Sequence, residues 1–169
     1  GSEFMWQNPG GGFGGCTSWC YGSVQWGGQT DYNLSFGLYG SAGGQSSFVE
    51  IGDGTSLTSY VPTYGYYNYS WSQVIYLQSE IGTPAVQIDK LAYHPGNNPS
   101  NYQMLNQKLY MKHTTEASFS NSDYPDPVAN GYTLVWEGDI TWNGNDWAEI
   151  LLTTPFIYNG VDNISVVWE

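Results

Sequence analysis

The chain contains no arginine and only three lysines, Lys90, Lys108 and Lys112, against 15 acidic residues, so its net charge at pH 7 is −12. So few cations cannot neutralise a phosphate backbone, which makes nucleic acids and anionic membranes unfavourable partners. Phosphoryl transfer is disfavoured for the same reason, because positive groups must surround the phosphate. The chain also lacks an apolar run of the roughly 18 residues that a membrane-spanning helix needs. These absences predict that it neither binds nucleic acid nor inserts into a membrane.

Cysteine is scarce as well, with Cys16 and Cys20 as the two in the chain. A structural zinc site needs about four ligands, and neither His94 nor His113 lies near these cysteines in the sequence. The short spacing permits a small disulfide loop, whose stabilising effect is limited by its size. A local disulfide and two free thiols therefore both remain open.

Aromatic residues and glycine are abundant: the chain holds 15 Tyr, 8 Trp, 6 Phe and 22 Gly, while only 11% of its residues are charged. Helix-favouring residues are few, and β-branched and aromatic residues are many. This composition is typical of an extracellular β-protein. We expect helix to make up less than about 10% of the chain.

The chain divides into three parts by composition. Residues 1–4 read as a cloning scar. Residues 5–47 are a Gly-rich, aromatic-rich lead-in or linker, with 32–39 as its one plausible strand. Residues 48–169 consist of apolar and aromatic stretches separated by turn residues, which predicts a single β-sandwich domain.

Short strands are predicted throughout the third part from alternation at period two, as at 105–113, where Leu105, Leu109 and Met111 share one side. Residues 143–146 predict a hairpin turn and residues 159–160 another turn, and helical turns are expected at most within 115–123 and 79–82. The fold expected is all-β, a jelly-roll-like antiparallel β-sandwich. Its predicted strands are 47–51, 71–77, 85–93, 105–113, 132–138, 139–142, 147–153 and 163–168.

Several stretches carry a resemblance to a known kind of module. They are IGDGTS (51–56), YNYSWSQVIYLQSEIG (67–82), IDKLAYH (88–94), KLYMKHTTEASFS (108–120), TLVWEGDITW (133–142) and TPFIYNGVDNISVVW (154–168). In this order they resemble a β-sandwich accessory module of large secreted or cell-surface proteins of Bacteroidetes-type bacteria, over residues about 48–169. The resemblance implies a bacterial surface location, flanking domains in a larger protein, and a role in adhesion or carbohydrate binding.

Catalysis is not expected. A Ser-His-Asp triad would need His94 or His113 as its base, and no G-x-S-x-G elbow is present to expose a serine. His113 falls in the HTT motif, where capping of a strand end is the simpler role. Glu137 and Asp139 point the same way from one strand, but solvated carboxylates are common in so acidic a chain.

Calcium is the cofactor that the loops allow. Asp53 stands between two glycines, and Asp162 and Asn163 lie in the closing motif, so each can offer the oxygen ligands that calcium prefers. No D-x-D-x-D-G loop is present. Capping of turns by these Asp and Asn side chains is the alternative.

Aromatic rings are the most informative feature for function, because exposed Tyr and Trp can stack on the apolar faces of sugars. Trp142 and Trp147 flank the predicted hairpin turn and form one candidate platform. The other candidate is the cluster Tyr64, Tyr66, Tyr67, Tyr69 and Trp71. Some of these rings must fill the core, since Leu and Ile are few. The sequence thus predicts a non-catalytic module that binds a neutral glycan or cell-surface polysaccharide; a structural spacer or protein–protein interaction module is the main alternative, and a small glycan hydrolase a weaker one.

Overall fold

The computed structural model describes residues 48–169 more completely than residues 5–47. Backbone and side chains are described at 36–40, 48–52, 62–63, 69–96, 98–120 and 123–169, and backbone alone at 5–7, 19–21, 24–25, 41–42 and 45–47. Three short strands, β1 (Met5–Gln7), β2 (Trp19–Tyr21) and β3 (Val24–Gln25), form a small antiparallel sheet. Whether Cys16 and Cys20 form a disulfide lies outside the described side chains.

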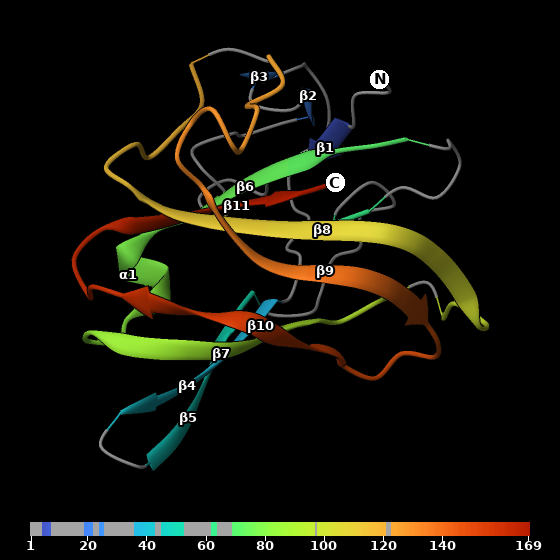
Figure 1. Ribbon diagram of the computed structural model, residues 1–169, viewed down its shortest axis with the longest axis horizontal. Helices are drawn as coiled ribbons and strands as arrows, with labels where there is room; N and C mark the ends of the chain where they lie inside the picture. Colours follow the sequence, from blue (N-terminus) through green and yellow to red (C-terminus); the bar gives the residue numbers. More distant parts are fainter. Residues whose placement is uncertain are drawn as a thin grey trace.

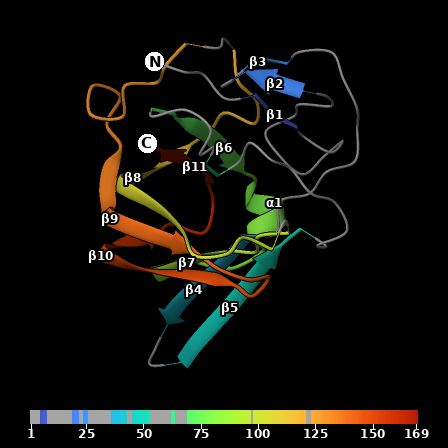
Figure 2. The same cartoon turned by 90° about the vertical axis from the view of Figure 1, so that its right-hand side faces the viewer.

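Two four-stranded antiparallel sheets make up the body of the protein and lie one above the other in Figures 1 and 2. The first has the order β10-β7-β4-β5 and the second the order β6-β11-β8-β9. Their strands are β4 (Phe36–Ala42), β5 (Gln45–Ile51), β6 (Ser72–Tyr76), β7 (Val86–Tyr93), β8 (Tyr102–Thr114), β9 (Thr133–Trp142), β10 (Ala148–Tyr158) and β11 (Asn163–Trp168).

The connections between strands mostly pass from one sheet to the other. From β5 onward, every connection except β8–β9 joins strands of different sheets. This alternation is what wraps a chain into a jelly-roll-like sandwich. The all-β antiparallel sandwich predicted from the sequence is confirmed. Within the described residues the one helix is α1 (Gln78–Ile81), which overlaps the predicted turn at 79–82, and no helix occupies the described positions of 115–123.

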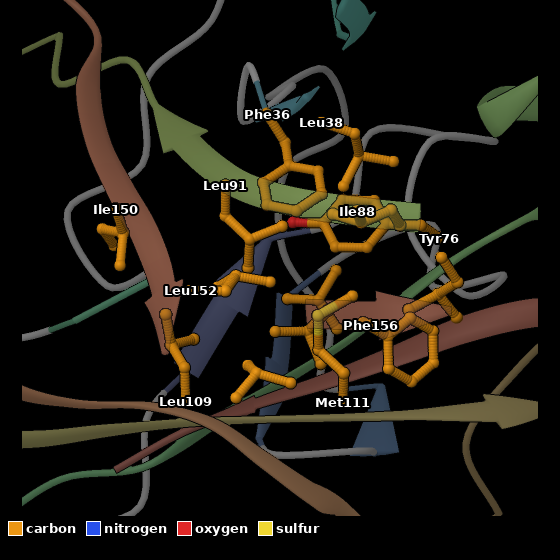
Figure 3. Packing of buried hydrophobic residues seen from close by; sticks show 14 of the residues in the cluster. Phe36, Leu38, Tyr76, Ile88, Leu91, Leu109, Met111, Ile150, Leu152 and Phe156 are labelled. Carbon is orange, nitrogen blue, oxygen red and sulfur yellow. The ribbon is translucent and has the colours of Figure 1, made fainter. Parts of the chain in front are cut away.

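The core lies between the two sheets, where apolar side chains from both meet (Figure 3). Phe36 of β4 stacks on Tyr76 of β6 with ring centroids 4.1 Å apart, and Leu38 is 3% exposed. Because β4 lies between β7 and β5, it is an interior strand of the first sheet. The predicted boundary at residue 48 is therefore wrong: the sandwich includes β4, which the sequence assigned to the 5–47 lead-in.

A β-bulge changes the side-chain alternation in β8. The β8–β9 register shifts between Met104 and Gln107, and Asn106 has a positive φ of 54°. The backbone N–H of Asn106 donates to the Asp139 carboxylate at 2.9 Å. Leu109 and Met111 are fully buried as predicted, but Leu105 is 55% exposed because the extra residue of the bulge reverses the direction of its side chain.

The turn at 143–146 does not close a hairpin. It leads from β9, in the second sheet, to β10, in the first, so these two strands are not neighbours within one sheet. The predicted strands 132–138 and 139–142 are one strand, β9. The predicted hairpin is wrong. A turn sequence specifies only that the chain reverses direction, and the strand after this turn, β10, pairs with β7 instead of β9.

Helix α1 holds a partly buried carboxylate. Glu80 accepts a hydrogen bond from the Leu77 backbone N–H at 2.8 Å, and Ile81 beside it is buried. Burial raises the pKa of Glu80 from 4.5 to about 7, against the opposing effect of the Leu77 N–H. The native state therefore retains a proton on Glu80 at pH values where the unfolded chain has lost it.

This pKa shift predicts a pH-dependent stability. Between pH 4.5 and about 7 the native state binds more protons than the unfolded state, so the free energy of unfolding falls as pH rises through this window. Glu80→Gln keeps an acceptor for Leu77 and removes the charge. We expect this variant to melt above the parent at pH 8 and close to it at pH 4, measured by circular dichroism. Glu116→Gln, at an exposed position, is the control; equal parent and Glu80→Gln melts at pH 8 would contradict the prediction.

Candidate functional site

Aromatic side chains gather on the outer face of the sheet β10-β7-β4-β5. Tyr39 of β4 and Phe48 of β5 are cross-strand partners, with ring centroids 4.5 Å apart. The Phe48 ring meets Trp147, just before β10, at 5.7 Å, and Trp147 meets His94, just after β7, at 5.4 Å. We call Tyr39, Phe48, His94 and Trp147 the outer-face cluster. Phe48 is 43% exposed, and the other three rings are half-buried.

Small residues beneath the cluster make room for it. Gly37 and Ala92 are cross-strand partners next to the outer-face cluster. A Cβ at Gly37 would lie 2.5 Å from Cε2 of Phe48 and 3.3 Å from Cβ of Ala92. The far edge of the Phe48 ring therefore lies directly over Gly37, which brings this ring across the sheet toward Trp147.

The charged groups beside the cluster neutralise one another. The Lys90 Nζ lies 2.7 Å from the Glu149 carboxylate and 4.5 Å from the centroid of the Tyr39 ring. The hydrogen bond to Glu149 raises the pKa of the Tyr39 hydroxyl, and the hydrogen bonds from Lys90 and Tyr39 lower the pKa of Glu149. Both groups are solvent-accessible, so this pair contributes little stability, but it leaves no uncompensated positive charge beside the rings.

The outer face of the second sheet is different, because other parts of the chain cover it. Tyr110 and Val167 on this face are buried together with Tyr132, which lies at the end of the β8–β9 connection. The Tyr132 hydroxyl pairs with Ser165 Oγ at 2.8 Å and accepts from Gln73 Nε2 at 2.7 Å. The buried rings on this side thus serve packing, whereas the outer-face cluster is a group of neighbouring rings that stays partly exposed.

The structure places the predicted ring residues in three different environments. Tyr69 is 80% exposed, whereas Trp71 and Trp142 are 7% and 6% exposed. Trp71 packs against Tyr124. The expectation of exposed rings at Trp71 and Trp142 is wrong, and neither belongs to a surface platform. Trp147 does lie at the surface, in the outer-face cluster, while Tyr64, Tyr66 and Tyr67 lie outside the described residues.

Trp142 is buried because the β9–β10 connection crosses between the sheets. Its side chain points into the sandwich, with ring centroids 5.9 Å from Trp168 and 6.4 Å from Tyr93. Within the described structure its indole N–H has no hydrogen-bond partner. The sequence did not predict that Phe48 would contact Trp147, nor that Tyr39 would join them by contacting Phe48, because both residues lie in or next to the segment 5–47 that was interpreted as a lead-in.

The predicted calcium ligands have partners within the protein. The Asp162 carboxylate accepts from Asn159 Nδ2 at 2.6 Å, and Asn163 Oδ1 accepts from the Gln78 backbone N–H at 2.8 Å. Asn163 Nδ2 donates to the Glu116 carbonyl at 2.9 Å. No group of three or more His, Cys, Asp or Glu side chains with metal-binding geometry occurs in the part of the chain that is described, and Asp53 lies outside it.

Calcium binding therefore stays a prediction that rests on Asp53 and on the net charge of −12. Binding to the native state alone would raise the melting temperature by mass action. Melting curves with excess calcium and with chelator measure this directly. Superimposable curves would exclude calcium binding to the native state at the concentrations tested.

The two histidines and Asp139, one of the paired acids, also have structural partners. His113 Nε2 accepts from the Asn159 backbone N–H at 3.2 Å, and its ring packs on Phe156 at 4.8 Å. His94 packs on Trp147, and the Asp139 carboxylate accepts a hydrogen bond from the backbone N–H of Asn106 at the bulge. These contacts give each group a role in holding turns or strand irregularities in place.

Comparison of the chain with models of protein families, with curated proteins and with solved structures yields no match. Within the described residues, no helix has the length and apolar character required to span a membrane.

Proposed function

We propose that this chain is a non-catalytic module that binds neutral glycans through the outer-face cluster, as part of a secreted or cell-surface bacterial protein with flanking domains. The observation that carries the proposal is the position of Tyr39, Phe48 and Trp147. These rings sit together on an open sheet face, although aromatic side chains elsewhere in the described chain mostly fill the core.

Ring stacking explains why such a surface suits sugars. An aromatic ring offers a rigid apolar face at low cost in conformational entropy, and that face matches the C–H side of a pyranose. Polar groups on the same face, Glu149 and Lys90 beside Tyr39 and the exposed Glu50 two residues from Phe48, can hydrogen-bond sugar hydroxyls. The structural partners of His94, His113 and Asp139 support a binding role without catalysis.

Protein–protein contact is the second candidate function. Leu151 and Ile157, which point outward from the edge strand β10, are 69% and 62% exposed. Exposed aliphatic side chains on an edge strand favour contact with another polypeptide. A spacer or interaction module would use these residues and leave the aromatic cluster unused.

The test compares matched aromatic variants. Trp147→Ala and Phe48→Ala are expected to weaken retention on neutral polysaccharides by about tenfold or more, the effect of losing a central contact ring worth about 1.4 kcal/mol. Tyr69→Ala removes a ring that is more exposed but lies outside the cluster, and should bind like the parent. Affinity electrophoresis in gels with and without polysaccharide measures the retention.

Stability is measured in the same variants. Because Phe48 is 43% exposed, its truncation should shift the melting temperature only slightly. Binding lost without loss of fold supports the proposal. A parent chain that no glycan retards favours the spacer or interaction module, whereas a Tyr69→Ala variant as impaired as Trp147→Ala would place glycan binding outside the cluster.

A further inference from the structure

The rings of the outer-face cluster do not lie in one plane. The Tyr39 and Phe48 ring planes are inclined by 40°, and those of Phe48 and Trp147 by 84°. The ring of His94 stands at 78° to that of Trp147. Phe48 and Trp147 thus form the two sides of a corner, with the edge of Phe48 resting over Gly37.

The shape of a corner restricts what can stack on it. The flat face of a crystalline polysaccharide presents its sugar rings in one plane, so it can stack on several protein rings only when those are coplanar. A single chain in solution can place one sugar unit between two rings that meet at a steep angle. The angle of 84° between Phe48 and Trp147 therefore fits the second ligand and not the first.

Charge restricts the ligand further. The one lysine beside the cluster, Lys90, is paired with Glu149 at 2.7 Å. Glu50 lies two residues after Phe48 in β5, on the same face, and is exposed. The chain as a whole carries a net charge of −12. A uronate or sulfated chain would meet repulsion here and no free cation.

We propose that the outer-face cluster binds one soluble chain of a neutral polysaccharide, with a sugar unit in the corner between Phe48 and Trp147, and does not bind crystalline polysaccharide surfaces. This inference rests on the proposed function and names the physical form and the charge of its ligand. Gly37 is a positioning residue for the corner, because its missing side chain lets the Phe48 ring lie across β4.

The experiment uses the complete chain and three kinds of probe: soluble neutral polysaccharides (a mixed-linkage β-glucan, an arabinoxylan and a mannan), polygalacturonate as the acidic polymer, and suspensions of microcrystalline cellulose and chitin. We expect retardation by at least one neutral polymer, none by polygalacturonate, and no depletion from the supernatant by the two crystalline solids. Trp147-dependent binding to a crystalline solid, or binding to polygalacturonate, overturns this inference while preserving glycan binding itself. Failure to bind any probe overturns both proposals.

A glycine variant tests the corner directly. Gly37→Ala places a methyl group 2.5 Å from Cε2 of Phe48, the movable end of a side chain, so the ring must shift while the strand is kept. We expect at least about fivefold weaker binding of the neutral polymer at an almost unchanged melting temperature. Unchanged affinity in Gly37→Ala would show that the position of Phe48 over this glycine does not matter and would overturn the corner arrangement.

Discussion

Replacing Trp168 with alanine is expected to lower the free energy of unfolding by about 3–5 kcal/mol, the usual cost of truncating a buried tryptophan. Trp168 is 2% exposed and lies in β11, an interior strand of the second sheet. Its ring contacts Tyr93 and Trp142, and its indole N–H donates to Gln107 Oε1 at 2.8 Å. Such a loss is a large part of the roughly 5–15 kcal/mol that stabilises a typical domain.

Trp142 provides the matched comparison. Its ring packs beside Trp168, but no partner for its indole N–H is found within the described structure. Trp142→Phe removes a buried donor that has no partner among the described residues, which offsets part of the lost packing. We expect it to cost about 1 kcal/mol less than Trp168→Phe, which also leaves a cavity and in addition loses a hydrogen bond. Urea denaturation followed by circular dichroism measures both; equal costs for the two Phe variants would refute this difference.

Gly160→Ala is the second substitution with a large expected effect. Gly160 lies in the turn between β10 and β11 with a φ of 78°, and a Cβ there would lie 2.5 Å from the Ala85 backbone N and 2.9 Å from the carbonyl carbon of Pro84. A left-handed conformation costs an L-residue about 1–2 kcal/mol, and forced backbone movement adds about 1–3 kcal/mol. The variant should therefore lose about 2–5 kcal/mol in urea denaturation.

Gly144 separates the two contributions. Its φ of 73° is similar, but no atom lies within 4 Å of the position that a Cβ would take. Gly144→Ala should lose only the conformational part, about 1–2 kcal/mol. Equal losses for Gly144→Ala and Gly160→Ala would show that the contact with 84–85 is unimportant.

The strands of the third part of the chain were predictable because their signal is local. In β11, Asn163–Trp168, predicted and observed bounds agree, and β7 differs by one residue at its start. Apolar residues at alternate positions and turn residues between them are determined by nearest neighbours. β4 escaped clear prediction because Gly37 and Gly40 interrupt its apolar pattern, although Phe36 and Leu38 fill the core.

The candidate site could be predicted only in part. Trp147 was identified as a surface ring, but Tyr39 and Phe48 join it through pairing between β4 and β5 and through the close approach of Phe48 to Gly37. No spacing within the sequence encodes this assembly. The hydrogen bond of Asp162 to Asn159 lies within one turn and agrees with the turn capping that the sequence left open, whereas the bond of Asn163 to the Gln78 N–H joins segments that only the folded chain brings together.

By itself the sequence determined the class of structure and gave the reason why an anionic ligand is disfavoured. Alternating apolar residues require a two-layer β-fold, and a chain with three lysines and no arginine offers almost no cations for an anionic partner. The tertiary structure decided which rings are available. Trp142 and Trp147 flank the same turn, yet one is buried and the other lies on the outer face, because the β9–β10 connection crosses between the sheets. Side-chain direction at such a crossing depends on where each strand pairs, which only packing of the complete sandwich determines.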